Sequence, residues 1–195
     1  MLAASAPGLE LVCPPRTHYG RYIPGPAHYA LVDLEQYYDQ FLLMTQNIDG
    51  LHWRAGSREI IELHGNINRK RCFDCGEYAR SWDEDGEIPP PCALCGGMLR
   101  PDVIWMGEGL PQHLLRLAYH AAEQAHVFFS IGASADVAPA AALPLIAKRA
   151  GAHVIAISDE EHTQTLLADI WLRGRVNDIL PALTEQIMQR GSSIL

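Results

Sequence analysis

The sequence has little positive charge and no long apolar run. Its 195 residues include 15 lysines and arginines against 23 aspartates and glutamates, which gives a formal net charge of -8. Proteins that bind a nucleic-acid backbone usually carry a basic surface, so we expect no direct nucleic-acid binding. The apolar stretches at 127–133 and 154–157 are far too short to cross a bilayer, and no lipidation signal is visible. We therefore expect no membrane association.

A secretory signal peptide is also absent, and only five cysteines occur. These two features favour a cytoplasmic protein whose thiols stay reduced. A chain of this length can bury one good core, or one domain together with a small metal-stapled module. A basic peptide suits the acidic composition better than nucleic acid does. The sequence does not indicate an oligomeric state.

Four of the cysteines have the spacing C-x2-C-x16-C-x2-C. Each C-x2-C pair can place two sulfurs on one cation from a tight turn, and two pairs complete a tetrahedron of thiolates. Zinc is the first choice of metal, with two disulfides, iron or a redox dithiol as alternatives. No open coordination position is in view, so we expect one structural zinc ion. Its predicted ligands are Cys72, Cys75, Cys92 and Cys95.

Helical and strand patterns alternate along the rest of the chain. Apolar residues recur at helical spacing over 28–40, and the short apolar run at 41–45 is typical of a buried strand. This alternation implies parallel strands joined by right-handed crossovers. Beyond the cysteines the pattern predicts an extended stretch at 102–106, helices at 111–125, 139–151 and 176–189, and strands at 126–132, 152–158 and 169–173.

Two polar motifs precede the cysteines: TQNIDGLH at 45–52 and IIELHGN at 60–66. The first follows a predicted strand, and loops at the carboxyl ends of parallel strands line the ligand crevice. An imidazole such as that of His64 titrates near neutral pH and can act as a base. An isolated histidine is more often a structural residue, however, and N-x-D-G is also good turn chemistry. The residues alone leave both interpretations open.

Three further motifs follow in order: RPDVIWMGE at 100–108, GASADVAPAA at 132–141 and G-x-V-x-x-I-L-P-x-L at 174–183. Together with the two earlier motifs and the cysteine spacing, they closely resemble the NAD-dependent protein deacylases called sirtuins. The resemblance runs from about Pro24 to Leu183. One such motif would be weak evidence, whereas five in the right order around the right cysteine spacing are strong.

The resemblance implies an enzyme that transfers the acyl group of an acyl-lysine protein or peptide to ADP-ribose and releases nicotinamide. In this family the acyl oxygen attacks C1′ of the nicotinamide ribose, and the histidine of the HG motif then activates a ribose hydroxyl. That histidine corresponds to His64. The implied catalytic residues are His64 and Asn47, and the implied cofactors are NAD and one zinc ion.

The resemblance also implies contacts with NAD. Asparagine and glutamine side chains can donate and accept, which suits a ligand rich in hydroxyl and amide groups. The family usually has an asparagine near the adenosine ribose, and Ser158 in its place shortens that contact. The implied cofactor-binding residues are Gln46, Asn47, Ile48, Asp49, Gly132, Ala133, Ser134, Ser158, Asp159, Glu160 and Val176.

The segment from Ile104 to Glu108 matches the stretch that pairs by its main chain with the substrate peptide in sirtuins. The family commonly has phenylalanine where Met106 stands, so we expect a looser acyl tunnel. The Tyr-x-x-Arg pair of the members that remove acidic acyl groups is not found before Pro24, which leaves the acyl preference open. The implied substrate-binding residues are Ile104, Met106, Gly107 and Glu108.

Sirtuins open with a strand and a G-A-G-x-S type loop that hold the pyrophosphate of NAD, and residues 1–27 show no such segment. A truncated sirtuin, a wrongly started reading frame and a degenerate paralogue are the explanations we consider. Two other functions stay open: a catalytically weak or inactive zinc- and peptide-binding module, and an NAD hydrolase or mono-ADP-ribosyltransferase.

The predicted fold class is α/β. We expect an incomplete Rossmann-like parallel sheet with helices on both faces, plus an inserted small zinc-ribbon module. The expected regions are an irregular lead-in at 1–27, a Rossmann-like NAD-binding domain at 28–68 and 106–190, and a zinc-binding module at 69–105.

Overall fold

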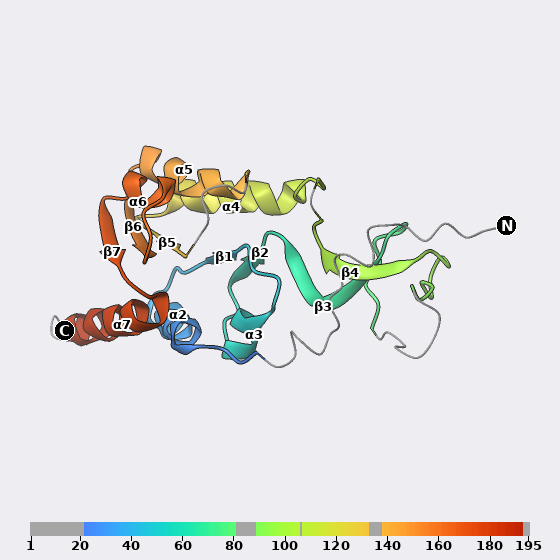
Figure 1. Ribbon diagram of the computed structural model, residues 1–195, viewed down its shortest axis with the longest axis horizontal. Coiled ribbons are helices and arrows are strands. Elements are labelled where there is room, and N and C mark those ends of the chain that lie inside the picture. Colours follow the sequence, from blue (N-terminus) through green and yellow to red (C-terminus); the bar gives the residue numbers. More distant parts are fainter. Residues whose placement is uncertain (1–21, 81–88, 106, 133–137, 193–195) are drawn as a thin grey trace.

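Two regions divide the fold in the computed structural model, which describes residues 22–80, 89–105, 107–132 and 138–192. At one end, parallel strands lie between pairs of helices, and at the other an antiparallel pair of strands extends outward (Figure 1). The elements are α2 (Pro26–Tyr37), β1 (Leu43–Thr45), α3 (Leu51–Ala55), β2 (Ile60–Glu62), β3 (Gly65–Cys72), β4 (Leu99–Val103), α4 (Gln112–Gln124), β5 (Val127–Ile131), the 3-10 turn η2 (Ala140–Ala142), α5 (Leu143–Arg149), β6 (His153–Ser158), α6 (Thr163–Leu167), β7 (Ile170–Arg173) and α7 (Val176–Ser192).

The parallel strands form two ladders. β5, β6 and β7 pair in that order, with Val127 opposite His153 and Ile155 opposite Ile170. β1 pairs in parallel with β2, starting from Leu43 opposite Ile60. The predicted α/β class with a parallel sheet is therefore confirmed.

Helices cover both faces of the three-stranded sheet, as predicted, because neighbouring residues of a strand point to opposite faces. Phe128 packs against the cluster that contains Ala118 and Ala122 of α4 and Ala147 of α5. Phe129, one position later, packs against the cluster formed by α2 and α7. The small side chains of α4 and α5 let these two helices lie close to the sheet and to each other.

Most predicted helices occur, with shifted ends. α2 begins at Pro26, two residues before the predicted start, because proline at the first helical position has no N–H group to leave unpaired. The helix predicted over 139–151 is divided into η2 and α5. Pro144 lies in the first turn of α5 and cannot donate a helical hydrogen bond, which explains this division.

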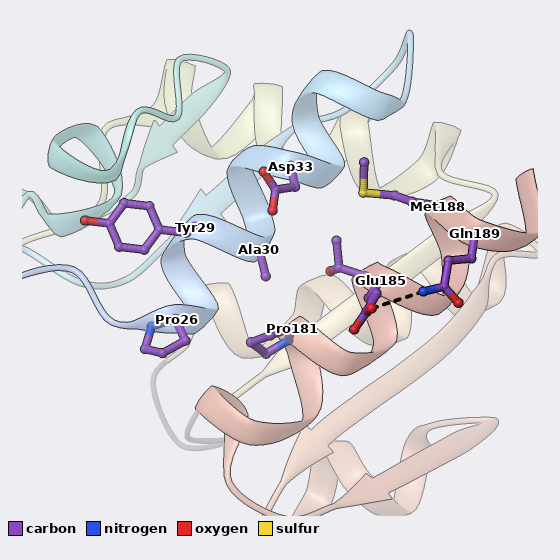
Figure 2. Close-up of a pocket in the computed structure, with 9 residues that line it drawn as sticks. Pro26, Tyr29, Ala30, Asp33, Pro181, Glu185, Met188 and Gln189 are labelled. Atoms are coloured by element: carbon purple, nitrogen blue, oxygen red, sulfur yellow. Dashed lines mark hydrogen bonds between the residues drawn. The ribbon is translucent and has the colours of Figure 1, made fainter. Parts of the chain in front are cut away.

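A groove of about 450 Å³ lies between α2 and α7 (Figure 2). Its floor includes Ala30 and the buried Thr184, whose Oγ1 has no hydrogen-bond partner, and Asp33 and Glu185 lie on its rim. Of the predicted catalytic, cofactor-binding and metal-binding residues that the structure describes, none lines it. The predicted site must therefore be assembled from loops and strand ends elsewhere.

The outer region is built on β3 and β4, which pair antiparallel from Gly65 opposite Val103 to Cys72 opposite Leu99. The register shifts between Asn66 and Lys70, so β3 carries a bulge. The predicted boundary between residues 68 and 69 falls inside β3. The division into domains stays a prediction.

Among the described residues, no helix combines the length and the apolar character that a bilayer span requires. Residues 1–21, which make up most of the predicted lead-in, lie outside the described residues.

Candidate functional site

The four paired cysteines converge at the end of the β3–β4 region. Their sulfur atoms all lie within 4.8 Å of one another. The sulfurs of Cys72 and Cys95 are 3.5 Å apart, and those of Cys75 and Cys92 are 3.8 Å apart. Tetrahedral zinc with Zn–S bonds of about 2.3 Å requires sulfurs about 3.8 Å apart. The four residues therefore fit one zinc ion.

Backbone N–H groups lower the pKa of one of these sulfurs. The pKa of Cys72 is lowered to about 7, chiefly because the N–H of Cys75 donates to its sulfur and secondly because that of Asp74 does so too. Gly76 and Gly96 have φ values of 74° and 76°, which is the left-handed conformation that glycine adopts without strain. The turn after each C-x2-C pair thus depends on its glycine.

His64 lies between β2 and β3, partly buried. Its Nδ1 is 3.2 Å from the carbonyl oxygen of Gln46. A carbonyl oxygen only accepts, so Nδ1 carries the proton of the neutral ring and Nε2 keeps a free lone pair. Gly65 has a φ of 80°, and a Cβ there would be 2.0 Å from the carbonyl oxygen of Asp102. No larger residue fits behind this histidine.

The loop after β1 brings three of the predicted NAD-binding residues to His64. Leu63 N donates to Thr45 O at 2.9 Å, and Ile67 N donates to Ile48 O at 2.8 Å, so both sides of His64 are attached to this loop. Asp49 Oδ1 accepts from the N–H of Leu51 at 2.9 Å, which is the turn contact expected of its side chain. The loop therefore presents Gln46, Asn47 and Ile48 beside the histidine.

The segment predicted to pair with the substrate follows β4. Ile104 N donates to the His64 carbonyl oxygen at 3.0 Å, which places this segment against the histidine. The carboxylate of Glu108 binds Arg100 through both oxygens, at 2.5 and 2.8 Å, and accepts from Trp105 N at 3.0 Å. The pKa of Glu108 is lowered, chiefly by the Arg100 hydrogen bonds. The Glu108 side chain therefore fixes the conformation of its own segment and attaches it to Arg100.

The remaining predicted NAD contacts lie at the carboxyl ends of β5 and β6 and at the start of α7. Gly132 N donates to Ile157 O at 3.0 Å, and a Cβ on Gly132 would lie 3.7 Å from Val176. The Ser158 hydroxyl donates to Glu160 O at 3.0 Å and accepts from Glu160 N at 3.2 Å. Gly132, Ser158 and Val176 are thus on one edge of the sheet.

Asp159 and Glu160 are exposed in the loop after β6, and Gly107 is exposed after Trp105. Ala133, Ser134 and Met106 lie outside the described residues.

Three charged residues that the motif analysis did not single out lie on the strands that flank His64. Arg69 donates through Nη1 to Glu62 and through Nε to Asp102 Oδ2 at 3.0 Å. The two carboxylate side chains are only 7% exposed. Burial lowers the pKa of Arg69, but hydrogen bonds and charges from Glu62 and Asp102 outweigh it and raise the pKa above its usual value. Only their charge within strands was a visible signal, and it does not predict that they meet.

His52 lies on α3, the short helix that follows the 46–49 loop. Its ring is 4.8 Å from that of His28, and its Nδ1 is buried without a partner. Its pKa is lowered to about 4, mainly by burial and then by the nearby His28, while Asp49 opposes the shift. The neutral imidazole of His52 is therefore a structural residue packed beside the loop.

These geometric features have counterparts in known proteins. The sequence model of the Sir2 family matches residues 15–139. The NAD-dependent protein deacylase 2 of Pyrobaculum aerophilum is 46% identical over 167 residues, which cover 86% of this chain and 67% of that protein. The chain thus spans about two thirds of that relative's length.

Solved structures agree with the sequence comparison. A Sir2 homologue in complex with NAD has a TM-score of 0.81 and 39% identity, covering 88% of this chain and 68% of that one. A Sir2 protein bound to an acetylated peptide has a TM-score of 0.79 and 30% identity, covering 91% and 74% of the two chains. This chain belongs to the Sir2 family, whose members are the sirtuins.

Proposed function

We propose that the protein is an NAD-dependent protein lysine deacylase. The observation that carries this proposal is the hydrogen bond from His64 Nδ1 to the Gln46 carbonyl oxygen, which leaves Nε2 free to take a proton. The family relationship and the deacylase names of the relatives support the same activity.

NAD, when bound, supplies the ribose carbon from which nicotinamide departs and to which the acyl oxygen becomes attached. In this proposal the loop at 46–49 binds the nicotinamide ribose, and Gly132, Ser158 and Val176 hold the adenosine end. His64 removes a proton from a ribose hydroxyl through Nε2. Asn47, one residue beyond the carbonyl that orients His64, helps to hold the same sugar.

The substrate in this proposal is an acyl-lysine within an extended peptide. Main-chain groups of Ile104 and Gly107 pair with it by strand addition, while Glu108 keeps that segment in shape. The neighbour that binds an acetylated peptide supports this class of substrate. We also propose a cytoplasmic location, because a thiolate-bound metal needs reduced cysteines.

The test is to incubate the purified protein with NAD and with acetyl-, succinyl- or longer acyl-lysine peptides, and to follow nicotinamide and deacylated peptide by mass. We expect His64→Tyr to lower turnover at least about a hundredfold, since it removes the base. His120→Tyr, at an exposed position on α4, is the matched control and should retain activity.

Deacylated peptide in equal amount from the wild type and His64→Tyr would refute the role of His64. Peptide binding without turnover in the wild type would refute the deacylase activity, and so would nicotinamide release without deacylation.

A further inference from the structure

Glu62, Arg69 and Asp102 form an ion-pair network on the strands that flank His64, with the two carboxylate side chains 7% exposed and the Arg69 side chain 41% exposed. Glu62 ends β2, two residues before the histidine, and Asp102 lies on β4 opposite Asn66. The guanidinium of Arg69 reaches both carboxylates at once through different nitrogens. The two buried carboxylates would be costly if left unpaired, so each of them depends on the partly exposed guanidinium of Arg69.

The second oxygen of Glu62 faces the loop after β1. Glu62 Oε1 accepts from Asn66 Nδ2 at 2.6 Å, and Asn66 Oδ1 accepts from Asn68 N at 2.9 Å. Asn68 Nδ2 in turn donates to the carbonyl oxygen of Asp49 at 2.9 Å. A continuous chain of hydrogen bonds therefore joins the Glu62 carboxylate to the 46–49 loop.

Arg69 connects the same carboxylate to β4. Asp102 is bound by Arg69 and, more loosely, by Arg71, whose Nε is 3.4 Å from Asp102 Oδ1. Two residues further on, Ile104 N donates to the His64 carbonyl oxygen. The close approach of Gly65 to the Asp102 backbone leaves little freedom between these strands. Glu62 is thus linked on one side to the 46–49 loop and on the other to the 104–108 segment.

We propose that Glu62, held by Arg69, is a positioning residue that sets His64 in register with the 46–49 loop and the 104–108 segment together. This inference rests on the proposed function, because it gives those segments their roles toward NAD and the peptide. An arginine is required at position 69, because different nitrogens of its planar guanidinium bind two carboxylates. A lysine would offer one compact ammonium group in its place.

The kinetic test compares Glu62→Gln, Arg69→Lys and Asp102→Asn with the wild type. Misplacement of reacting groups by about 1 Å can cost about a hundredfold in rate. We expect Glu62→Gln to lower kcat by about tenfold to a hundredfold, Asp102→Asn to act mainly by raising KM for the peptide, and Arg69→Lys to do both more weakly. Lys148→Met on α5, which removes the ion pair between Lys148 and Asp169, is the control and should leave both parameters unchanged.

The outcome that overturns the proposal is wild-type kcat and KM in Glu62→Gln. A loss of activity that only parallels a loss of folded protein or of bound zinc would also overturn it, because that is a purely structural effect. If Glu62→Gln does not fold, Arg69→Lys takes its place in the comparison of kcat and KM with the wild type. This variant keeps the positive charge and loses the guanidinium that binds two carboxylates.

A second readout does not depend on turnover. Hydrogen exchange of the backbone amides should accelerate in Glu62→Gln at Ile67 and Ile104 together, while the β5–β6 amides stay protected. If the wild type does not deacylate any peptide, the proposed function fails, and this exchange experiment still decides the positioning role. Unchanged exchange at either amide would refute it.

Discussion

The cysteine region and the parallel sheet are stabilised by different means. The sheet of β5, β6 and β7 has helices on both faces and an apolar cluster on each. The cluster described at the cysteines contains only Cys72, Cys92 and Leu99, with Ala79 packed against it. So small a core does not offset the entropy lost on ordering the chain, and metal binding must supply the difference.

His64 lies where these two regions meet. β3 starts directly after it and ends at Cys72, the first metal ligand. The predicted base is therefore placed on one side by the apolar cluster that includes Ile61 and Leu63, and on the other by a metal-dependent region.

Removing the metal should unfold the cysteine region and leave the parallel sheet folded, and this is the largest effect we expect. Structural zinc contributes about 10 kcal/mol or more in small zinc domains. A chelator, or Cys92→Ser, should abolish hydrogen-exchange protection of Cys72 N and Leu99 N while β5 and β6 stay protected. Cys13→Ser is the control and should keep full zinc content. Loss of protection in both regions at once would show that they are one cooperative unit.

A cavity in the apolar cluster should lower the stability of the protein without loss of zinc. Leu180 is fully buried and packs with Leu34 and Ile157. Leu180→Ala should lower the free energy of unfolding by about 2–5 kcal/mol, through lost burial and the cavity left behind. Urea denaturation followed by circular dichroism measures this, and zinc content should not change. Leu166→Ala, at a side chain 71% exposed, should change stability by less than about 0.5 kcal/mol.

The smallest expected effect is the pH response of His52. Its pKa falls from an ordinary 6.5 to about 4 on folding, so the unfolded chain binds more protons between these values. Stability from the neutral ring is complete above pH 6.5 and is lost as the pH falls toward 4. After allowance for partial exposure, we expect about 1–2 kcal/mol.

Unfolding of His52→Asn at pH 7 and pH 4.5 measures this effect, with the exposed His120→Asn as control. A wild-type pH dependence in His52→Asn would contradict the assignment to this ring.

The parts of the fold that could be predicted are those encoded locally. The four cysteines were predictable because metal geometry fixes their spacing within each tight turn. The apolar runs of β5 and β6 and the helical repeat of α2 likewise carry their information within a few neighbouring residues. α5 was predicted too long, although Pro144 was a visible signal for its late start.

Contacts between distant residues were not accessible in the same way. β2 has three residues, and its pairing with β1 depends on register across a long connection. Arg69 and Asp102 are 33 positions apart, and no local pattern predicts that they meet. Glu108 was predicted to contact the substrate because its motif matches. Only the structure shows that both of its oxygens are bound to Arg100.

The contact between α2 and α7 has a consequence for biosynthesis. Ala27 N donates to Asn177 Oδ1 across 150 positions, and Leu34 of α2 packs in the same cluster as Leu180 of α7. A ribosome needs on the order of ten seconds to add that many residues. The apolar stripe of α2 meanwhile stays uncovered in the nascent polypeptide and is a natural target for chaperones. Pulse proteolysis of stalled chains of increasing length should show protection of α2 only after α7 has emerged.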